Sequence, residues 1–144
     1  MPETTVTELT TEVEWRAAYP VMAELRPIPE EQYMTYLRTM ADEGYRLFGL
    51  FEGDDLLAVG GVRISTTFYH GSHIWVYDLV TREDRRSEGH GETLLAHLEQ
   101  WGADRGCAVI ELASGLWRDD AHRFYENRMD YERYCYTFKK DLHE

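Results

Sequence analysis

The chain has 144 residues, of which 43% are hydrophobic and 29% charged, with a formal net charge of -12 at pH 7. This length predicts a single domain, residues 1–144, with a core of its own, and the composition excludes intrinsic disorder. No apolar run approaches the roughly 20 residues of a spanning helix, and "MPETTVTELT" lacks the basic and apolar regions of a secretory signal. Such an acidic chain repels polyanions, and two cysteines, Cys107 and Cys135, are typical of a reducing compartment. We therefore expect a cytoplasmic protein without a nucleic-acid or membrane partner.

The basic residues are unusual in kind. Of the fifteen Lys and Arg residues, only Lys139 and Lys140 are lysines. An acidic, lysine-poor surface suits a cytoplasm of high salt concentration, where repulsion between carboxylates is screened. A GC-rich genome would also favour arginine, so the sequence leaves the halophilic interpretation and this one open.

The first third of the chain predicts a strand and two helices. Pro20 lies inside the first helix and is expected to kink or split it. Pro29 begins the second helix, in which apolar residues follow at i, i+4 and i+7, and Gly44 ends it. The expected elements are a strand at 4–9 and helices at 12–26 and 29–44.

The middle of the chain predicts an antiparallel meander. Three runs rich in aromatic and β-branched residues are separated by the turn signals "GDD" and "HGS". Gly60 and Gly61 indicate a bulge or bend in the second run. The three expected strands are residues 45–52, 56–69 and 73–80.

The last part of the chain returns to helical periodicity. A helix is expected from Gly89 to about Gly106, between the strand at 73–80 and a buried strand at 107–114. This crossover makes the two strands parallel, so the fold class is α+β with a mixed, mostly antiparallel sheet. Two further elements are a helix that Asp119 or Asp120 caps, running to about Arg128, and a final strand at 131–140.

The stretch "RRSEGHGETLL" (85–95) joins the central strand to that helix through two glycines. Free N–H groups at a helix start and the positive end of its dipole bind anions, and Gly89 and Gly91 let the backbone approach closely. Arg86 could add a charge-assisted contact. No Gly-Lys-Ser/Thr follows, which excludes a P-loop, and the glycine spacing is not that of a dinucleotide-binding fingerprint. By itself the pattern also fits a plain helix entry.

Two motifs carry a resemblance to a known family. "Arg86-Ser-Glu-Gly89-His-Gly91" resembles the Arg/Gln-x-x-Gly-x-Gly/Ala signature of the GNAT superfamily of acyl-CoA-dependent N-acetyltransferases. "AHRFYENRMDY" (121–131) resembles the family's second motif, Ala-x-x-Phe/Leu-Tyr-Glu-x-x-Gly-Phe. The order of elements matches over nearly the whole chain. The resemblance implies an α/β/α fold whose two parallel strands splay apart.

The resemblance also implies acetyl-CoA as co-substrate, with its pyrophosphate on the glycine loop and its pantetheine arm along the preceding strand. One backbone N–H near Leu79 or Val80 would then polarise the thioester carbonyl. The residues so assigned to coenzyme A are Leu79, Val80, Thr81, Arg86, Ser87, Glu88, Gly89, His90, Gly91, Glu92 and Thr93. No metal is expected, because His70 and His73 lack a third ligand at suitable spacing.

Two residues are expected to act in catalysis. Tyr125 matches the family tyrosine that protonates the leaving thiolate, although it could instead be a packing aromatic. Asp78 on the central strand is the first choice for the general base. His73 is the second, and a chain of water molecules is the third.

Some positions depart from the family pattern. Ser87 replaces a glycine and is expected to tighten the turn, while Glu88 and Glu92 stand where basic residues are common and should weaken phosphate binding. Residues 129–144 are short for the usual two-strand ending, which favours a homodimer in which a partner supplies a strand.

The resemblance therefore predicts an enzyme that moves an acetyl group from acetyl-CoA to a primary amine of a small molecule or a peptide. The alternative is a non-catalytic module of the same fold that binds or senses acyl-CoA. A third interpretation keeps the fold class and treats the glycine loop as a plain helix entry.

Overall fold

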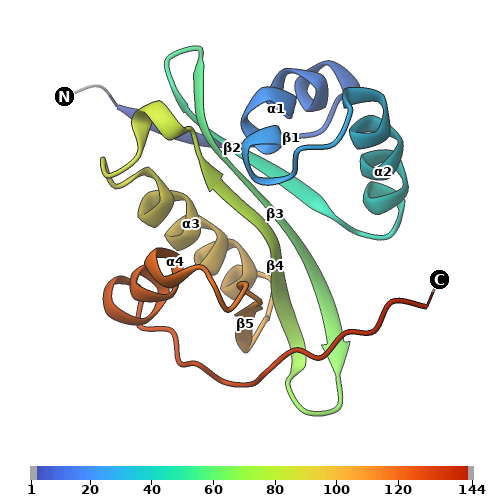
Figure 1. Ribbon diagram of the computed structural model, residues 1–144, viewed down its shortest axis with the longest axis vertical. Helices are drawn as coiled ribbons and strands as arrows, with labels where there is room; N and C mark the ends of the chain where they lie inside the picture. The colour runs from blue at the N-terminus through green and yellow to red at the C-terminus, as the bar shows by residue number, and fades with distance from the viewer. Residues whose placement is uncertain (1–2, 143–144) are drawn as a thin grey trace. The chain divides into compact units, whose positions relative to one another are not determined.

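The computed structural model describes residues 3–142 (Figure 1). The chain divides into two compact units, Met1–Leu112 and Ala113–Glu144. All the strands found in the described residues belong to the first unit. Whether residues 1–144 act as a single domain stays a prediction.

The first unit is built on one five-stranded sheet in the order β1-β2-β3-β4-β5. The first four strands pair antiparallel, whereas β4 and β5 are parallel and are joined through the helix α3. This confirms the predicted mixed, mostly antiparallel sheet with one crossover. The strands are β1 (Thr4–Leu9), β2 (Arg46–Glu52), β3 (Asp55–Thr67), β4 (Gly71–Thr81) and β5 (Val109–Leu112).

Helices cover both faces of this sheet. Figure 1 shows α1 and α2 on one face and α3 on the other, which gives the first unit three layers. The bounds are α1 (Glu12–Leu25), α2 (Glu30–Asp42) and α3 (His90–Asp104), with a short 3₁₀ turn, η1 (Glu83–Arg85), between β4 and α3.

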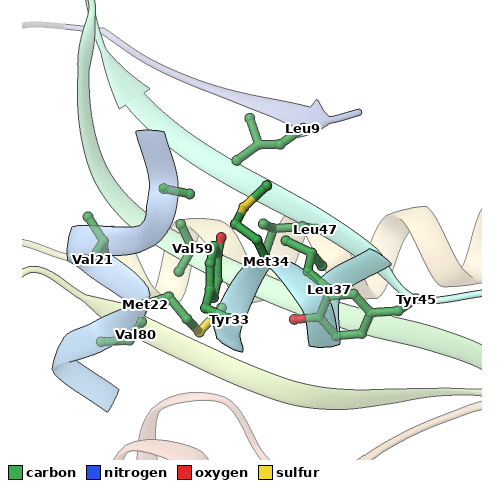
Figure 2. Close-up of a cluster of buried hydrophobic side chains, with 11 residues drawn as sticks. Leu9, Val21, Met22, Tyr33, Met34, Leu37, Tyr45, Leu47, Val59 and Val80 are labelled. Carbon is green, nitrogen blue, oxygen red and sulfur yellow. The ribbon is translucent and has the colours of Figure 1, made fainter. Parts of the chain in front are cut away.

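The main core lies between the sheet and the α1–α2 layer (Figure 2). Its buried members come from β1 to β4, from both helices and from the residue just before β2: Leu9, Ala18, Val21, Met22, Tyr33, Met34, Leu37, Tyr45, Leu47, Val59 and Val80. Removing this apolar surface from water is the main force that fixes the two helices on the sheet. On the opposite face, α3 packs so closely that a Cβ at Gly60 would lie 2.9 Å from Leu98 Cδ1.

The helix termini explain why α1 and α2 begin and end where they do. Thr11 caps α1 and forms a capping box with Glu14. Pro29 is the N-cap of α2, and Gly44 follows its end with a φ of +104°, a conformation that favours glycine. Pro20 was expected to kink or split α1, and the split is wrong, because the helix is continuous through Pro20. A proline removes one helical hydrogen bond, and the buried residues on either side of this one hold the helix against the sheet.

The β3–β4 ladder contains a bulge in its middle. Gly61 pairs with Asp78 and Val62 pairs with Val76, so Tyr77 is the extra residue and belongs to β4. A bulge was predicted at Gly60–Gly61, and its place is confirmed, but the extra residue lies on the partner strand. The pairing of β5 with β4 ends at Val76, so beyond the bulge no strand of the first unit pairs with that edge of β4.

The second unit holds a short α-helix, α4 (Asp119–Arg123), which continues as a π-helical turn, η2 (Phe124–Arg128). This confirms the helix expected there.

The strand predicted at 131–140 is wrong, because residues 131–142 form neither helix nor strand. Alternating residues predict a strand only where a neighbouring strand completes the ladder, and Tyr134, Tyr136 and Phe138 are instead exposed. The strand predicted at 107–114 forms as β5, although it is half-buried rather than buried.

Candidate active site

The glycine loop between β4 and α3 presents backbone groups rather than side chains. Gly89 is the N-cap of α3 with a φ of +88°, and no side chain caps the helix there. The first helical hydrogen bond runs from Thr93 N–H to Gly89 O, so the N–H groups of His90 and Gly91 have no acceptor within the helix. A Cβ on Gly89 would meet nothing within 4 Å. The start of α3 is therefore open to an anion.

Ser87 has a φ of +66°, one of two positive values found for residues other than glycine in the described chain. It stands where the family pattern has glycine. In this turn the serine takes the left-handed conformation, at a cost of order 1 kcal/mol.

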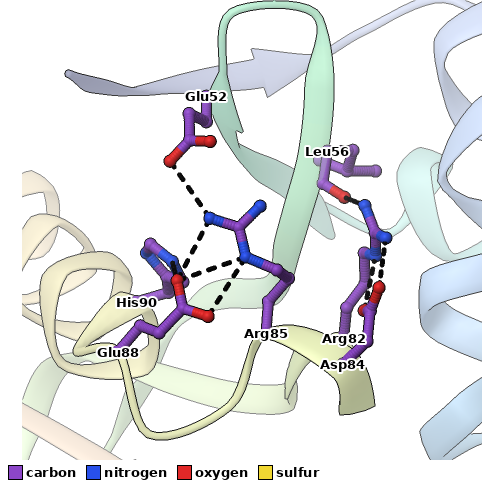
Figure 3. A network of polar contacts seen from close by, with 7 residues as sticks. All are labelled: Glu52, Leu56, Arg82, Asp84, Arg85, Glu88 and His90. Carbon is purple, nitrogen blue, oxygen red and sulfur yellow. Dashed lines mark hydrogen bonds and ion pairs between the residues drawn. The ribbon is translucent and has the colours of Figure 1, made fainter. Parts of the chain in front are cut away.

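Arg85 is the centre of a polar network at this loop (Figure 3). Its guanidinium donates to both carboxylate oxygens of Glu88 at 3.1–3.2 Å and to Glu52 at 3.1 Å. His90 Nε2 lies 3.2 Å from the same Glu88 carboxylate. The Arg85 hydrogen bonds, helped by His90, lower the pKa of Glu88 below its usual value. The Glu88 carboxylate is thus turned towards Arg85.

Arg86 takes a different position. Its Nε donates to Thr81 O at 3.2 Å, and its Nη2 lies 3.8 Å from Glu24 Oε1. The same Glu24 oxygen accepts the N–H of Glu83 at 2.7 Å. Because 53% of the Arg86 side chain is exposed, its guanidinium remains accessible beside the glycine loop.

The register of β4 assigns directions to its backbone groups. Arg82 N–H donates to Leu57 O at 2.8 Å, and directly bonded pairs alternate along an antiparallel ladder. Val80 and Asp78 therefore point their N–H groups towards β3, whereas Leu79 and Thr81 point theirs to the other side. No strand of the first unit pairs there, because β5 ends opposite Val76. Leu79, and not Val80, then has the N–H that points to this unpaired edge of β4.

Asp78 lies next to the bulge and is buried, with 8% exposure. Arg26 Nε donates to its Oδ1 at 2.9 Å, and the Tyr45 hydroxyl donates to its Oδ2 at 2.7 Å. Burial, and then the negative charge of Asp78, raise the pKa of Tyr45 well above its ordinary value. His73, the other candidate base, is also buried, but it lies where β4 is still paired with β5.

Tyr125 belongs to the second unit, in η2. Its ring packs against Phe124 and Tyr131 at centroid distances of 5.3 and 5.8 Å. Burial raises the pKa of its hydroxyl, which keeps the group protonated at neutral pH. The structure thus places Asp78, the β4 backbone and the glycine loop along one continuous segment of the first unit, and Tyr125 in the second unit.

Sequence reasoning missed two residues of the first unit. Arg26 and Tyr45 both contact Asp78, from 52 and 33 residues away along the chain. The one local signal was Gly61, since a Cβ there would overlap the Tyr45 hydroxyl.

Within residues 3–142, no group of three or more His, Cys, Asp and Glu side chains could hold a metal ion. Nor does any helix in that range have both the length and the apolar character needed to cross a membrane.

The acetyltransferase (GNAT) family model matches residues 10–131. The chain belongs to this family. A relative from Bacillus subtilis (strain 168), named uncharacterized N-acetyltransferase YhdJ, is 38% identical over 137 residues, which are 94% of this chain and 96% of that protein. This GNAT protein is thus an N-acetyltransferase of the family that uses acetyl-CoA.

Solved structures show the same fold. A transcriptional regulator from Bacillus halodurans C-125 has a TM-score of 0.83 at 22% identity, over 97% of this chain and 100% of that one. The aminoglycoside N-acetyltransferase AAC(6')-Iy, solved in complex with CoA, has a TM-score of 0.84 at 11% identity, over 97% and 95%. At these identities the likeness concerns the GNAT fold alone.

Proposed function

We propose that this GNAT enzyme moves an acetyl group from acetyl-CoA to a primary amine of a small molecule or a peptide. One observation carries the proposal. Beyond its bulge, β4 has an edge with which no strand of the first unit pairs, and this edge leads to a helix start whose N–H groups are open. A strand edge without a partner, followed directly by an anion site, suits a long co-substrate that carries a pyrophosphate.

In this proposal the pyrophosphate lies on the backbone of residues 86–93, and the pantetheine arm lies along Leu79, Val80 and Thr81. The Leu79 N–H polarises the thioester carbonyl, because the register points it to the unpaired edge of β4. Arg86 adds a charge-assisted contact from the rim of the loop.

The transfer needs one bond formed and one broken. The amine nitrogen attacks the carbonyl carbon, and the C–S bond then breaks to release the thiolate of coenzyme A. Asp78 accepts the proton that the amine loses, directly or through water, and Tyr125 gives its proton to the thiolate. The raised pKa of Tyr125 agrees with a group that still carries its proton when the thiolate leaves.

We further propose that the enzyme works in the cytoplasm as a homodimer, without nucleic acid or a membrane as partner. The exposed, alternating aromatic residues Tyr134, Tyr136 and Phe138 support a second copy as the partner of this segment. Light scattering after size-exclusion chromatography measures the mass, and a monomer at micromolar concentration would remove the homodimer.

The cofactor loop is tested by Gly89→Glu, with Gly106→Glu as matched control. The two glycines flank α3, have φ values of +88° and +84°, and have open space where a Cβ would stand. Both variants carry the same strain and charge, but only Gly89→Glu puts the carboxylate at the proposed pyrophosphate site. We expect calorimetry to show loss of CoA binding for Gly89→Glu and binding close to wild type for Gly106→Glu. Equal binding by both variants would remove the loop assignment.

The proton donor is tested by Tyr125→Phe, with Tyr131→Phe as control, because the two rings are neighbours and each variant loses one hydroxyl. With acetyl-CoA and a panel of amines, thiol release should fall about 10²-fold for Tyr125→Phe while acetyl-CoA affinity is retained. The Tyr131 variant should keep its turnover. Binding of acetyl-CoA by the wild type without turnover on any amine would instead identify an acyl-CoA-binding module.

A further inference from the structure

Arg26 connects the end of α1 to the bulge of β4. It is the C-cap residue of α1, and its guanidinium contacts two consecutive residues of the strand. Nε donates to Asp78 Oδ1 at 2.9 Å, and Nη2 donates to the backbone oxygen of Tyr77 at 2.9 Å. Arg26 therefore binds both the extra residue of the bulge and the carboxylate next to it.

A bulge interrupts the ladder and leaves backbone groups of the inserted residue without a strand partner. Arg26 supplies the donor for the Tyr77 carbonyl. A planar guanidinium presents several N–H groups in a fixed arrangement, so one side chain can hold two acceptors in a defined relative orientation.

Tyr45 completes the arrangement from the other side of the carboxylate. Its hydroxyl donates to Asp78 Oδ2 at 2.7 Å from a position that is 5% exposed. The hydroxyl fits because the residue opposite Asp78 is Gly61, where a Cβ would overlap it. Each oxygen of Asp78 therefore has its own donor, and the carboxylate is fixed in orientation.

The bulge also decides which side of the sheet each residue of β4 faces. Ile74 packs on Gly102 of α3, and Leu79 lies beside Gly60 on that same α3 face. Residues five positions apart in a regular strand would face opposite sides. The extra residue restores the match, and it leaves Asp78 on the α1–α2 face. Holding Tyr77 and Asp78 therefore also holds Leu79, whose N–H points to the unpaired edge of β4.

We propose that Arg26 is a positioning residue for acetyl transfer: it fixes the bulge, and through it the Leu79 N–H and the Asp78 carboxylate. The inference rests on the proposed function for its effect on turnover. Arg26 contacts no residue of the glycine loop in these hydrogen bonds, so its loss should lower kcat and leave the affinity for acetyl-CoA almost unchanged.

The experiment compares Arg26→Gln and Arg26→Lys with Arg38→Gln in the full chain. Arg38 is a suitable control because it donates through two nitrogens to Glu12 on the outer surface of the α1–α2 layer. We expect kcat to fall about 10²-fold in Arg26→Gln, as for loss of a positioned oxyanion donor, with KM for acetyl-CoA within about threefold. Arg26→Lys should recover part of the loss, since an ammonium can serve one acceptor well but not both. Arg38→Gln should match the wild type.

A second readout does not depend on turnover. In ¹⁵N–¹H spectra of the apo protein, the amide signals of Tyr77, Asp78 and Leu79 should shift in Arg26→Gln and stay in place in Arg38→Gln. Wild-type kcat in Arg26→Gln, or a kcat loss matched by an equal loss of acetyl-CoA affinity, overturns the proposal. If the wild type acetylates no amine, the proposed function fails, and unmoved Leu79 signals would then overturn the positioning role separately.

Discussion

The residues of the glycine loop show how an acidic segment can still present an anion site. Arg85 is shared by Glu52 and Glu88, and Arg86 lies 3.8 Å from Glu24. Two arginines against three glutamates leave no net positive side-chain charge. We therefore expect backbone N–H groups and the helix dipole of α3, rather than arginine charge, to supply most of the attraction for a phosphate. Pairing with Arg85 also explains how Glu88 is accommodated there.

Tyr45 gives a prediction about stability at this same scale. Its pKa is raised well above 10.0, first by burial and then by the charge of Asp78. Below pH 10 the hydroxyl is protonated in both the folded and the unfolded chain, and its contribution to stability is complete. Above pH 10 the unfolded chain loses this proton first, so the contribution falls as the pH rises. Thermal unfolding of the wild type should therefore shift to lower temperature above pH 10.

Replacing Tyr45 by Phe should change that profile in two ways. At pH 8 the variant should be less stable by about 1–2 kcal/mol, because the buried Oδ2 of Asp78 loses its donor. From pH 10 to 11.5 the difference from the wild type should shrink. Circular-dichroism melts across this range measure both effects, with Tyr36→Phe as the control at an exposed tyrosine. Parallel curves for wild type and Tyr45→Phe would contradict a raised pKa.

At the scale of the elements, the sequence predicts best what local pattern determines. The meander and the crossover helix follow from turn signals and from a change of period, and the structure confirms both. Elements that depend on a partner are less predictable: the final strand lacks a ladder, and α1 tolerates Pro20 because the sheet holds it. Gly60 and Gly61 predicted the position of the bulge, but a glycine in a strand can also leave room for a side chain from another element. Here Gly61 admits Tyr45, and the extra residue is on β4.

The residues of the candidate site also fall into those that the sequence could predict and those that it could not. The glycine loop could be found because its residues are consecutive and match a family motif. Arg26 and Tyr45 could not, because they meet Asp78 only after α1, β2 and β4 have packed together. An arginine that holds a bulge stands at no fixed spacing from it in the sequence, so such positioning residues can be identified only in the folded chain.

For the whole molecule, the charge balance is strongly acidic. Twenty-seven acidic residues stand against fifteen basic ones. Several arginines have acidic partners, such as Arg16 with Glu30 and Glu31, but exposed pairs of this kind contribute only about 0–1 kcal/mol each. The excess negative charge is not cancelled by such pairing, and its repulsion destabilises the compact state.

Added salt should therefore stabilise this protein. The screening length falls from about 10 Å at 0.1 M to about 3 Å at 1 M, which weakens repulsion among the carboxylates over the whole surface. The exposed ion pairs are weakened too, but each contributes little. We expect stability to rise by about 1–2 kcal/mol from low to molar KCl, or roughly 3–8 °C in melting temperature for a chain of this size. Scanning calorimetry measures the shift.

Melting temperatures in KCl and in potassium sulfate separate two causes of stabilisation by salt. Screening of charge repulsion saturates as the salt concentration rises, whereas exclusion of a salt such as potassium sulfate from the protein surface continues to stabilise. The shape of the melting temperature plotted against the concentration of each salt therefore shows which cause acts. A melting temperature that stays flat in KCl would show that the net charge does not limit stability, and would leave base composition as the explanation for the scarcity of lysine.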